Sequence, residues 1–382
     1  MMRIATRPHS PWQKTCDSFH ESCWIPASLC RYIASGFLFA VLSIGGSGAF
    51  GQVSPWFVKA IYYEPLGSTG FRSISGMATD PLSGELYVLD AGRHAVDVID
   101  SAGFPRFTFN HWVTDQKTGQ KSAGEPNSIA ITSEGDIYLT DFFSHKIDIL
   151  NIRGEVIEHI DMLADVGWEG TSLRPEKLGI DTLGWLYASI GGERSGILRR
   201  RLDGGRAEVF LDAAAEKIDC ITGMAVAADG RLAILDYRGV PAVRIYSPEG
   251  KLLLGFGDHE IAGGDLSFPV SMLFAEDGTY WVADGLRQAV KHYSSDGKFL
   301  EFIGGFGGAP GNLRFPSALV GDGVSHLAVA ERVGRRVQQY VLPGALAANE
   351  LKSLRPANAS PIPPGLEPPA SSEVASDPQT EK

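Results

Sequence analysis

The chain has 382 residues, 45 of them glycine, and a formal net charge of −11. This acidic balance argues against a dedicated nucleic-acid binder and against a protein that docks on anionic membranes, because both need basic surfaces. Three of the four cysteines precede residue 32, and only Cys220 lies beyond residue 54. The part of the chain that contains Cys220 therefore cannot form an internal disulfide, and the spacing of the other three fits no zinc motif.

Residues 1–52 form an N-terminal extension with one uncharged apolar run at residues 32–50. Arg31 precedes the run, and small residues at 45–49 lie near its end. This order predicts a secretory signal sequence and export to the periplasm or the cell exterior. The run is also just long enough to span a bilayer, so an uncut single membrane anchor is the alternative. The basic region before the run is unusually long, as a mis-assigned start site would make it.

Between residues 55 and 343 one pattern of short apolar runs and turns recurs six times. The clearest copy spans residues 268–305, and turn pairs such as Asp277-Gly278 and Asp296-Gly297 separate its runs. The four runs are 268–274, 280–283, 289–293 and 299–303. Four antiparallel strands joined by tight turns make one blade of a β-propeller.

An acidic residue ends the second run of nearly every copy. The six positions are Asp90, Asp141, Ser189, Asp236, Asp284 and Glu331, at intervals of 51, 48, 47, 48 and 47 residues. Such a fixed period indicates a repeat architecture. We therefore predict an all-β fold, a six-bladed β-propeller of four-stranded antiparallel blades. The acids are expected to accept hydrogen bonds from backbone N–H groups in the turn that follows, with a ligand role as the alternative.

The two ends of the repeat region predict how the ring closes. The last copy reaches Pro343 without a fourth strand, whereas residues 56–63 form an apolar segment with no copy of their own. Pairing this segment with the last blade would leave no long strand edge exposed. Residues 344–382 are rich in Pro, Ala and Ser without apolar periodicity, so a disordered tail is expected.

The repeat resembles the NHL repeat. The matching features are Phe268-Pro269, Asp277-Gly278, Ala283-Asp284, Ala289-Val290, Asp296 to Leu300 and the glycine-rich exit at 304–316. The resemblance covers roughly residues 56–342 and implies a six-bladed propeller of the TolB-like superfamily type. Its weakest copy is residues 173–211, which lacks the acid. Scaffolds and enzymes share this fold, so the resemblance does not choose a function.

Strand alternation predicts which residues could form a site. It brings the acids, the residues after them and the connections between blades to one end of the central channel, here called the acid end. His94 and His145 occupy equivalent positions there in blades 1 and 2. They could be turn residues or metal ligands.

The first strands predict which side chains reach the channel. Aligning them places Asn127 and Glu176 at one level and Lys177 one step further, where the other five blades have only small or apolar residues. A ligand-binding role is one reading of these three residues. The alternative for Glu176 and Lys177 is pairing with neighbours on a solvated rim.

Two long connections carry further candidates. Residues 109–125 contain His111 and Trp112, and residues 161–175 contain Trp168. These side chains could be exposed anchors for a peptide or glycan partner, or they could cover the ring as packing.

Taken together, these patterns favour an exported, monomeric, non-enzymatic binding or scaffold propeller without a cofactor. Its ligand would be a protein or small molecule at the channel mouth, and not a nucleic acid. The alternative is a Ca²⁺- or Zn²⁺-dependent hydrolase, lactonase or lyase acting in the channel. No histidine falls on the first strands, and Asn127 and Glu176 alone do not make a metal site. The chain also lacks a Gly-x-Ser-x-Gly elbow, a phosphate loop and a His-Glu-x-x-His motif.

Overall fold

The computed structural model describes residues 56–61, 70–114, 119–259, 262–321 and 323–342. The predicted signal or anchor at 32–50 and the predicted tail at 344–382 lie outside these ranges. Within them, no helix is both long and apolar enough to cross a membrane.

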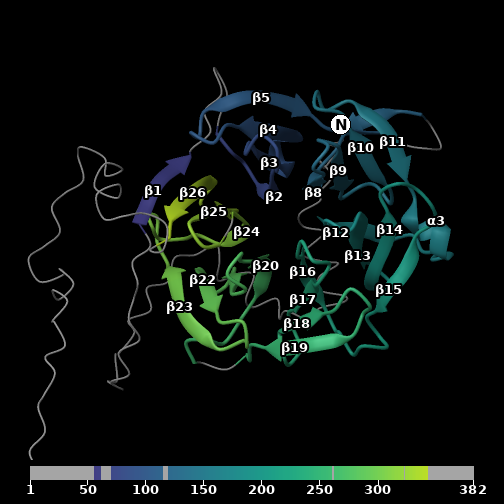
Figure 1. Cartoon of the computed structure of the whole chain (residues 1–382). Helices are drawn as coiled ribbons and strands as arrows, with labels where there is room; N and C mark the ends of the chain where they lie inside the picture. Colours follow the sequence, from purple (N-terminus) through teal and green to yellow (C-terminus); the bar gives the residue numbers. More distant parts are fainter. Residues whose placement is uncertain (1–55, 62–69, 115–118, 260–261, 322, 343–382) are drawn as a thin grey trace, which may run out of the picture. The chain divides into compact units, whose positions relative to one another are not determined.

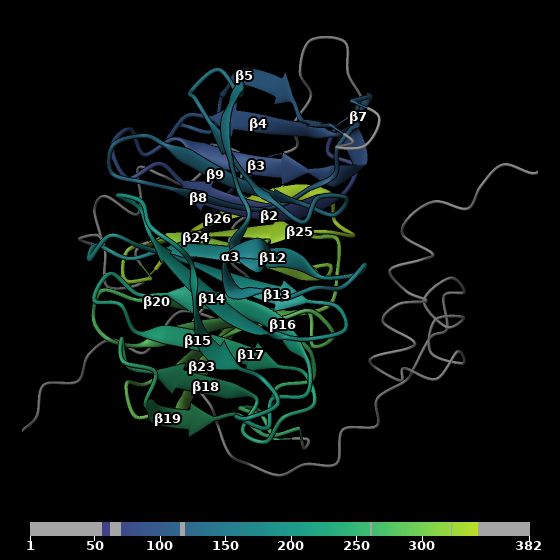
Figure 2. The ribbon, with the colours of Figure 1, turned by 90° about the vertical axis from the view of Figure 1, so that its right-hand side faces the viewer.

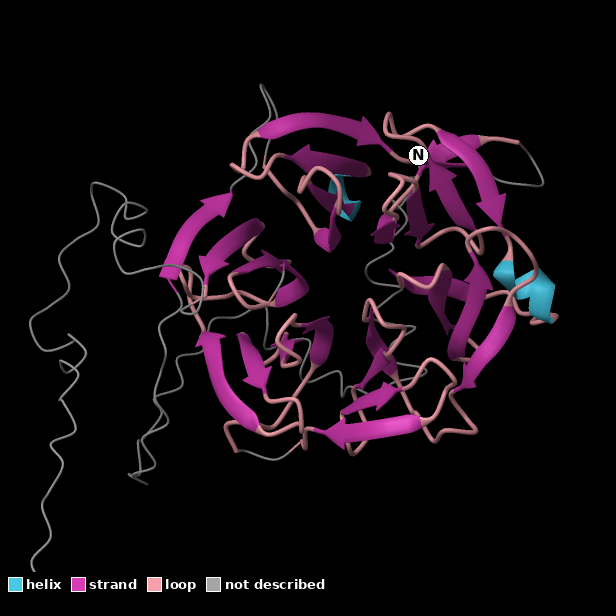
Figure 3. Ribbon diagram, viewed as in Figure 1, coloured by secondary structure: helices cyan, strands magenta, loops and turns pink. Residues whose placement is uncertain are grey.

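Six four-stranded antiparallel sheets surround a central axis as the blades of a propeller, which confirms the predicted fold (Figure 1, Figure 3). Seen from the side, the inner strands run roughly along the axis of the ring (Figure 2), whereas outer strands such as β5, β19 and β23 follow its rim (Figure 1). The first strand of each blade lies innermost and the fourth outermost, except that β1 is the outer strand of blade 6.

The strand bounds follow the predicted runs closely. Blade 1 comprises β2 (Ile74–Thr79), β3 (Leu86–Asp90), β4 (Ala95–Ile99) and β5 (Pro105–Asn110). Blade 2 comprises β8 (Pro126–Ile131), β9 (Ile137–Asp141), β10 (Ile147–Leu150) and β11 (Val156–Ile160). Blade 3 comprises β12 (Arg174–Ile180), β13 (Trp185–Gly191), β14 (Gly196–Arg201) and β15 (Glu208–Asp212). Blade 4 comprises β16 (Ile221–Val226), β17 (Leu232–Asp236), β18 (Val243–Tyr246) and β19 (Leu252–Phe256). Blade 5 comprises β20 (Pro269–Phe274), β21 (Tyr280–Asp284), β22 (Ala289–Tyr293) and β23 (Phe299–Gly304). Blade 6 comprises β24 (Pro316–Gly321), β25 (His326–Glu331), β26 (Arg336–Val341) and β1 (Trp56–Ile61).

Packing between blades explains the apolar pattern of the strands. The second strands β3, β9, β17 and β21 are buried along their whole length, because a neighbouring blade covers each face. The outer strand β5 is exposed at every position but one. The apolar clusters join residues of adjacent blades, as Leu89 of blade 1 and Leu139 of blade 2 do. The core is therefore a series of layers between blades.

The N-terminal strand closes the ring, as predicted. β1 pairs antiparallel with β26, from Trp56 opposite Val341 to Ile61 opposite Val337. The last blade thus gains its fourth strand from the other end of the repeat region, and β26 has no free edge over this length.

Four elements in the connections were not predicted. The 109–125 connection contains a hairpin of β6 (Trp112–Thr114) and β7 (Lys121–Ala123). The 161–175 connection contains α3 (Met162–Val166), whose first turn the Asp161 carboxylate caps through the N–H of Ala164. A short 3₁₀ helix, η1 (Ala91–Arg93), follows the first acid.

Candidate functional site

The recurring acids are buried and structural. In blades 1, 4 and 5 the carboxylate accepts two backbone N–H groups from the segment just before the first strand of its own blade. These bonds join Arg72 and Ser73 to Asp90 (2.8 and 2.9 Å), Asp219 and Cys220 to Asp236 (3.1 and 3.0 Å), and Ser267 and Phe268 to Asp284 (2.6 and 3.0 Å). The predicted bonds to the following turn also occur, from Phe143 to Asp141, Arg238 to Asp236 and Leu286 to Asp284. Each of these acids therefore secures loops of its own blade.

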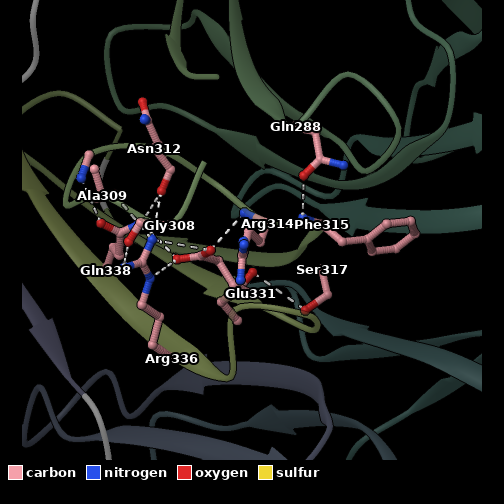
Figure 4. A network of polar contacts seen from close by, with 12 residues as sticks. Gln288, Gly308, Ala309, Asn312, Arg314, Phe315, Ser317, Glu331, Arg336 and Gln338 are labelled. Atoms are coloured by element: carbon pink, nitrogen blue, oxygen red, sulfur yellow. Dashed lines mark hydrogen bonds and ion pairs between the residues drawn. The ribbon is translucent and has the colours of Figure 1, made fainter. Parts of the chain in front are cut away.

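Glu331 of blade 6 belongs to a larger polar network, which Figure 4 shows. It accepts the Arg314 N–H at 2.7 Å, the Arg336 Nε–H at 2.5 Å and the Gln338 amide at 2.7 Å. Arg336, which is 2 % exposed, also donates to the carbonyls of Gly308 and Asn312. The glycine-rich exit of blade 5 is thus anchored on the third strand of blade 6.

Blade 3 replaces the acid with other groups. The strand register puts Ile190, and not Ser189, in the place of the acid, because Ile190 pairs with Pro175 as Asp141 pairs with Pro126 in blade 2. The Ser189 hydroxyl accepts the Lys177 N–H at 2.9 Å, as the Thr140 hydroxyl accepts the Ser128 N–H. The Glu193 carboxylate accepts the Ser172 N–H at 3.2 Å and so takes over a contact that the missing acid would make. The repeat pattern does not predict this role, because Glu193 lies outside the repeated positions.

The first level of channel residues holds neighbouring blades together. In four blades the side chain donates to a backbone carbonyl of the next blade. These bonds are Ser75 to Pro126 (2.6 Å), Asn127 to Glu176 (3.0 Å), Thr222 to Pro269 (2.6 Å) and Ser317 to Ile74 (3.3 Å). Asn127 is 4 % exposed, and its amide nitrogen is engaged in this junction. The geometry therefore gives Asn127 a structural contact.

At the second level of channel residues, small side chains allow adjacent first strands to approach closely. A Cβ on Gly76 would lie 3.0 Å from the Asn127 carbonyl oxygen, and one on Gly223 would lie 2.7 Å from that of Val270. The Ser128 hydroxyl accepts the N–H of Leu178 in the next blade at 3.0 Å. Because adjacent strands approach so closely, the other five blades have only Gly, Ser or Ala at this level, and blade 3 with Lys177 is the exception.

Glu176 takes the ion-pair alternative. Its carboxylate lies 3.2 Å from the Arg174 guanidinium and against Gly191, where a Cβ would come within 2.3 Å of it. The register of β12 against β13 is irregular between Pro175 and Leu178. Glu176 and Lys177 lie in this irregular stretch and therefore leave the regular ladder. Burial in the channel raises the pKa of Glu176, while Arg174 opposes that shift.

Lys177 has no such partner. It lines a central cavity of about 140 Å³, and no carboxylate within the described residues forms an ion pair with its ammonium group. Burial, followed by the charge of Arg332 on the opposite blade, lowers the pKa of Lys177 to about 8, and Glu176 opposes this shift. Lys177 and Arg332 thus place positive charge at the centre of an acidic protein.

An arc of aromatic rings lies at the same end of the channel. The Tyr237 and Phe268 rings meet edge to face at 5.0 Å, and Phe268 lies 6.0 Å from Phe315. The Arg332 guanidinium stands 5.5 Å above the Phe315 ring. Sequence reasoning missed this arc, because Phe268 and Phe315 were read only as the start of a repeat. The acid end therefore has an aromatic half and a cationic side.

The two histidines at equivalent positions make separate local contacts. His94 has a left-handed backbone (φ 59°) and donates through Nδ1 to the Gly124 carbonyl at 2.7 Å, which holds the segment that follows β7. The His145 side chain is 51 % exposed, and its Nε2 lies 3.8 Å from Asp161. Their contacts are those of turn residues.

Of the three candidate residues in the two long connections, two are buried and one is exposed. His111 is 1 % exposed, with Nε2 3.4 Å from Asp141 and 3.6 Å from Asp148. Trp168 is also buried, beneath the Arg194 guanidinium. Of the two alternatives, packing therefore holds for His111 and Trp168, because the insertions fold their large side chains inward. Trp112 is 51 % exposed and can meet a partner.

The donor set does not fit a channel metal. Within the described residues, no group of three or more His, Cys, Asp or Glu side chains is placed to hold a metal ion. Glu176 is paired with Arg174, and the Asn127 amide nitrogen donates to the Glu176 carbonyl, which leaves the amide oxygen of Asn127 as one isolated candidate ligand. These two residues do not supply the converging oxygens that calcium requires.

Comparison with known proteins supports the assignment of the fold. No family model and no curated protein sequence matches the chain. A catalytically inactive virginiamycin B lyase from Staphylococcus aureus, solved with quinupristin, is 12 % identical with a TM-score of 0.50, over 70 % of this chain and 80 % of that one. A structural genomics protein of unknown function from Bacteroides thetaiotaomicron is 12 % identical with a TM-score of 0.54, over 76 % and 74 % of the two chains. At such identities the likeness shows the propeller fold alone.

Proposed function

We propose that this protein is an exported, non-enzymatic binding propeller of the NHL type, which receives a protein or small-molecule ligand at the acid end of its channel. A monomer suffices for this role, since one ring contains the whole site. The observation that carries the proposal is Lys177. It is the one long cationic side chain at a channel level where the other blades have Gly, Ser or Ala.

The chemistry of the site favours a ligand that carries a carboxylate on an apolar body. Lys177 and Arg332 can together bind an anionic group with charge-assisted hydrogen bonds. The cavity of about 140 Å³ beside Lys177 has room for such a group but not for a large ligand. The rest of the ligand would lie above it against Tyr237, Phe268 and Phe315, whose rings offer apolar surface.

The experiment is a calorimetric titration of the full chain with 3-phenylpropionate, which joins a carboxylate to a phenyl ring. We expect binding to the unaltered protein and about tenfold or greater weakening in Lys177→Gln, because a hydrogen bond to a charged group contributes on the order of 1.5–3 kcal/mol. Lys251→Gln is the matched control, since Lys251 is exposed on blade 4 away from the channel. Equal affinity in the two variants would contradict the proposal.

The alternative function is the Ca²⁺- or Zn²⁺-dependent hydrolase, lactonase or lyase. Elemental analysis of the purified protein separates it from the binding function. A stoichiometric calcium or zinc ion that raises the melting temperature would replace the binding proposal, because specific binding to the folded state stabilises it.

A further inference from the structure

A larger cavity lies between blades 2 and 3 at the opposite end of the ring from the acids. Its volume is about 650 Å³, and the turns between the first and second strands of both blades form much of its wall. Pockets of this size accommodate small organic molecules. It shares no lining residue with the central cavity beside Lys177.

Hydrogen bonds hold one turn of the cavity wall in place. Thr182 donates to the Ala228 carbonyl with both its N–H (3.1 Å) and its hydroxyl (2.6 Å). These bonds fix the blade 3 turn against blade 4. Thr182 and Ala228 both line the cavity, and the 132–136 turn of blade 2 forms another part of its wall.

The cavity combines apolar surface with a hydroxyl group. Ile131, Ile180 and Leu202 supply aliphatic side chains. Tyr138 lines the same space and is only 4 % exposed, and its hydroxyl makes no hydrogen bond within the described part of the chain. The hydroxyl is therefore available to hydrogen-bond with a polar group of a ligand.

The charge of the lining is negative. The wall includes Glu134, Asp136, Asp181 and Asp203 against one cation, Arg201. Arg201 is already engaged, because it donates to the Leu183 carbonyl at 2.8 Å and lies 3.6 Å from Asp203.

Two of the four carboxylates are available to a ligand. Asp181 accepts the Trp185 N–H and the Tyr187 hydroxyl. The carboxylates of Glu134 and Asp136 form no ion pair within the described residues and are exposed on the 132–136 turn. After burial, Asp136 is the strongest influence that raises the pKa of Tyr138, which places this charge near the hydroxyl.

We propose that this cavity is a second binding site, specific for an amphipathic cation: an ammonium group carried by an apolar or aromatic body. Asp136 and Glu134 receive the cation, the aliphatic side chains pack against the body, and the Tyr138 hydroxyl hydrogen-bonds to the polar end. The site is independent of the proposed carboxylate site, since the two lie at opposite ends of the ring and have opposite charge.

The test compares 2-phenylethylamine with 2-phenylethanol, which keeps the body and removes the charge. In titrations of the full chain at neutral pH we expect the amine to bind about two- to fivefold more tightly for each exposed carboxylate that it meets. Asp136→Asn should reduce this preference by about two- to fivefold, Asp136→Asn combined with Glu134→Gln should abolish it, and both variants should leave the alcohol unchanged. Tyr138→Phe should weaken both ligands. Glu276→Gln is the matched control, because Glu276 is an exposed acid on the corresponding turn of blade 5.

Equal affinity for the amine and the alcohol would overturn the proposal, and so would an amine preference that survives the combined Glu134→Gln and Asp136→Asn variant. The carboxylate site fails or succeeds separately. Lys177→Gln should leave amine binding unchanged, and Asp136→Asn should leave 3-phenylpropionate binding unchanged.

Discussion

The direction of the Lys177 side chain follows from the level of the channel at which it stands, where the other blades have Gly, Ser or Ala. At this level adjacent first strands approach so closely that Gly76 and Gly223 leave no room for a Cβ. A lysine side chain cannot enter such a junction, so it extends into the channel instead. There burial and Arg332 together lower the pKa of Lys177 to about 8.

This shift predicts a pH-dependent affinity. The ordinary lysine pKa is 10.5, so an exposed lysine would stay protonated where Lys177 begins to lose its proton. An anionic ligand needs the protonated form, and bound ligand raises the pKa. We therefore expect the affinity for 3-phenylpropionate to be constant below about pH 8 and to fall by about tenfold over the next two pH units.

The matched variant for this profile is Lys177→Arg. A guanidinium keeps its charge throughout this range, so its affinity should not decline between pH 7 and about pH 10. Isothermal titrations at several pH values check both profiles. A decline of equal size in the arginine variant would assign the titration to another group.

Individual site residues differed in how far the sequence could predict them. Lys177 could be found by aligning the repeats, because it departs from what its equivalents share. Phe268 and Phe315 could not, since a Phe-Pro pair looks like the entry of the repeat. Arg332 follows the acid at a position where the six copies share no residue type, so no pattern singles it out. For His111 the choice between exposure and packing stayed open, because an insertion without a period gives no indication of which of its faces is buried.

At the scale of elements, the repeat period predicted the blades and missed what interrupts them. Alternation over 268–305 gave four strands that match β20 to β23 to within a residue or so. The β6–β7 hairpin and α3 lie in connections with no period, and only their contacts fix them. His94 holds the Gly124 carbonyl beside the hairpin, and Asp161 caps α3.

The network around Glu331 predicts a large loss of stability when its cation is removed. Arg336→Met would leave a buried carboxylate without its charged partner and would release the carbonyls of Gly308 and Asn312. Breaking a buried pair in this way costs about 3–5 kcal/mol. Denaturant unfolding should show this loss, whereas the exposed Arg153→Met should change stability by about 0.5 kcal/mol or less. A similar small change in both would show that the network contributes little.

At the scale of the whole molecule, the ring depends on a contact between segments far apart in the chain. β1 supplies the fourth strand of blade 6, and its pairing with β26 leaves the blades without an open seam there. Without β1, residues 336–341 would present a strand edge next to the buried side chains of Val337 and Tyr340. Exposed edges of this kind promote aggregation.

We therefore expect deletion of residues 55–64 to give insoluble or aggregated protein. Deletion of residues 1–52 is the matched control, because it removes a longer segment and keeps β1. Expression of both in the cytoplasm, followed by size-exclusion chromatography and thermal unfolding, separates loss of the closing strand from loss of the N-terminal extension. If the 55–64 deletion were soluble and melted in one cooperative transition at the temperature of the control, the ring would not depend on this closure. The pairing of β1 with β26 would then be a contact that the folded blades tolerate losing.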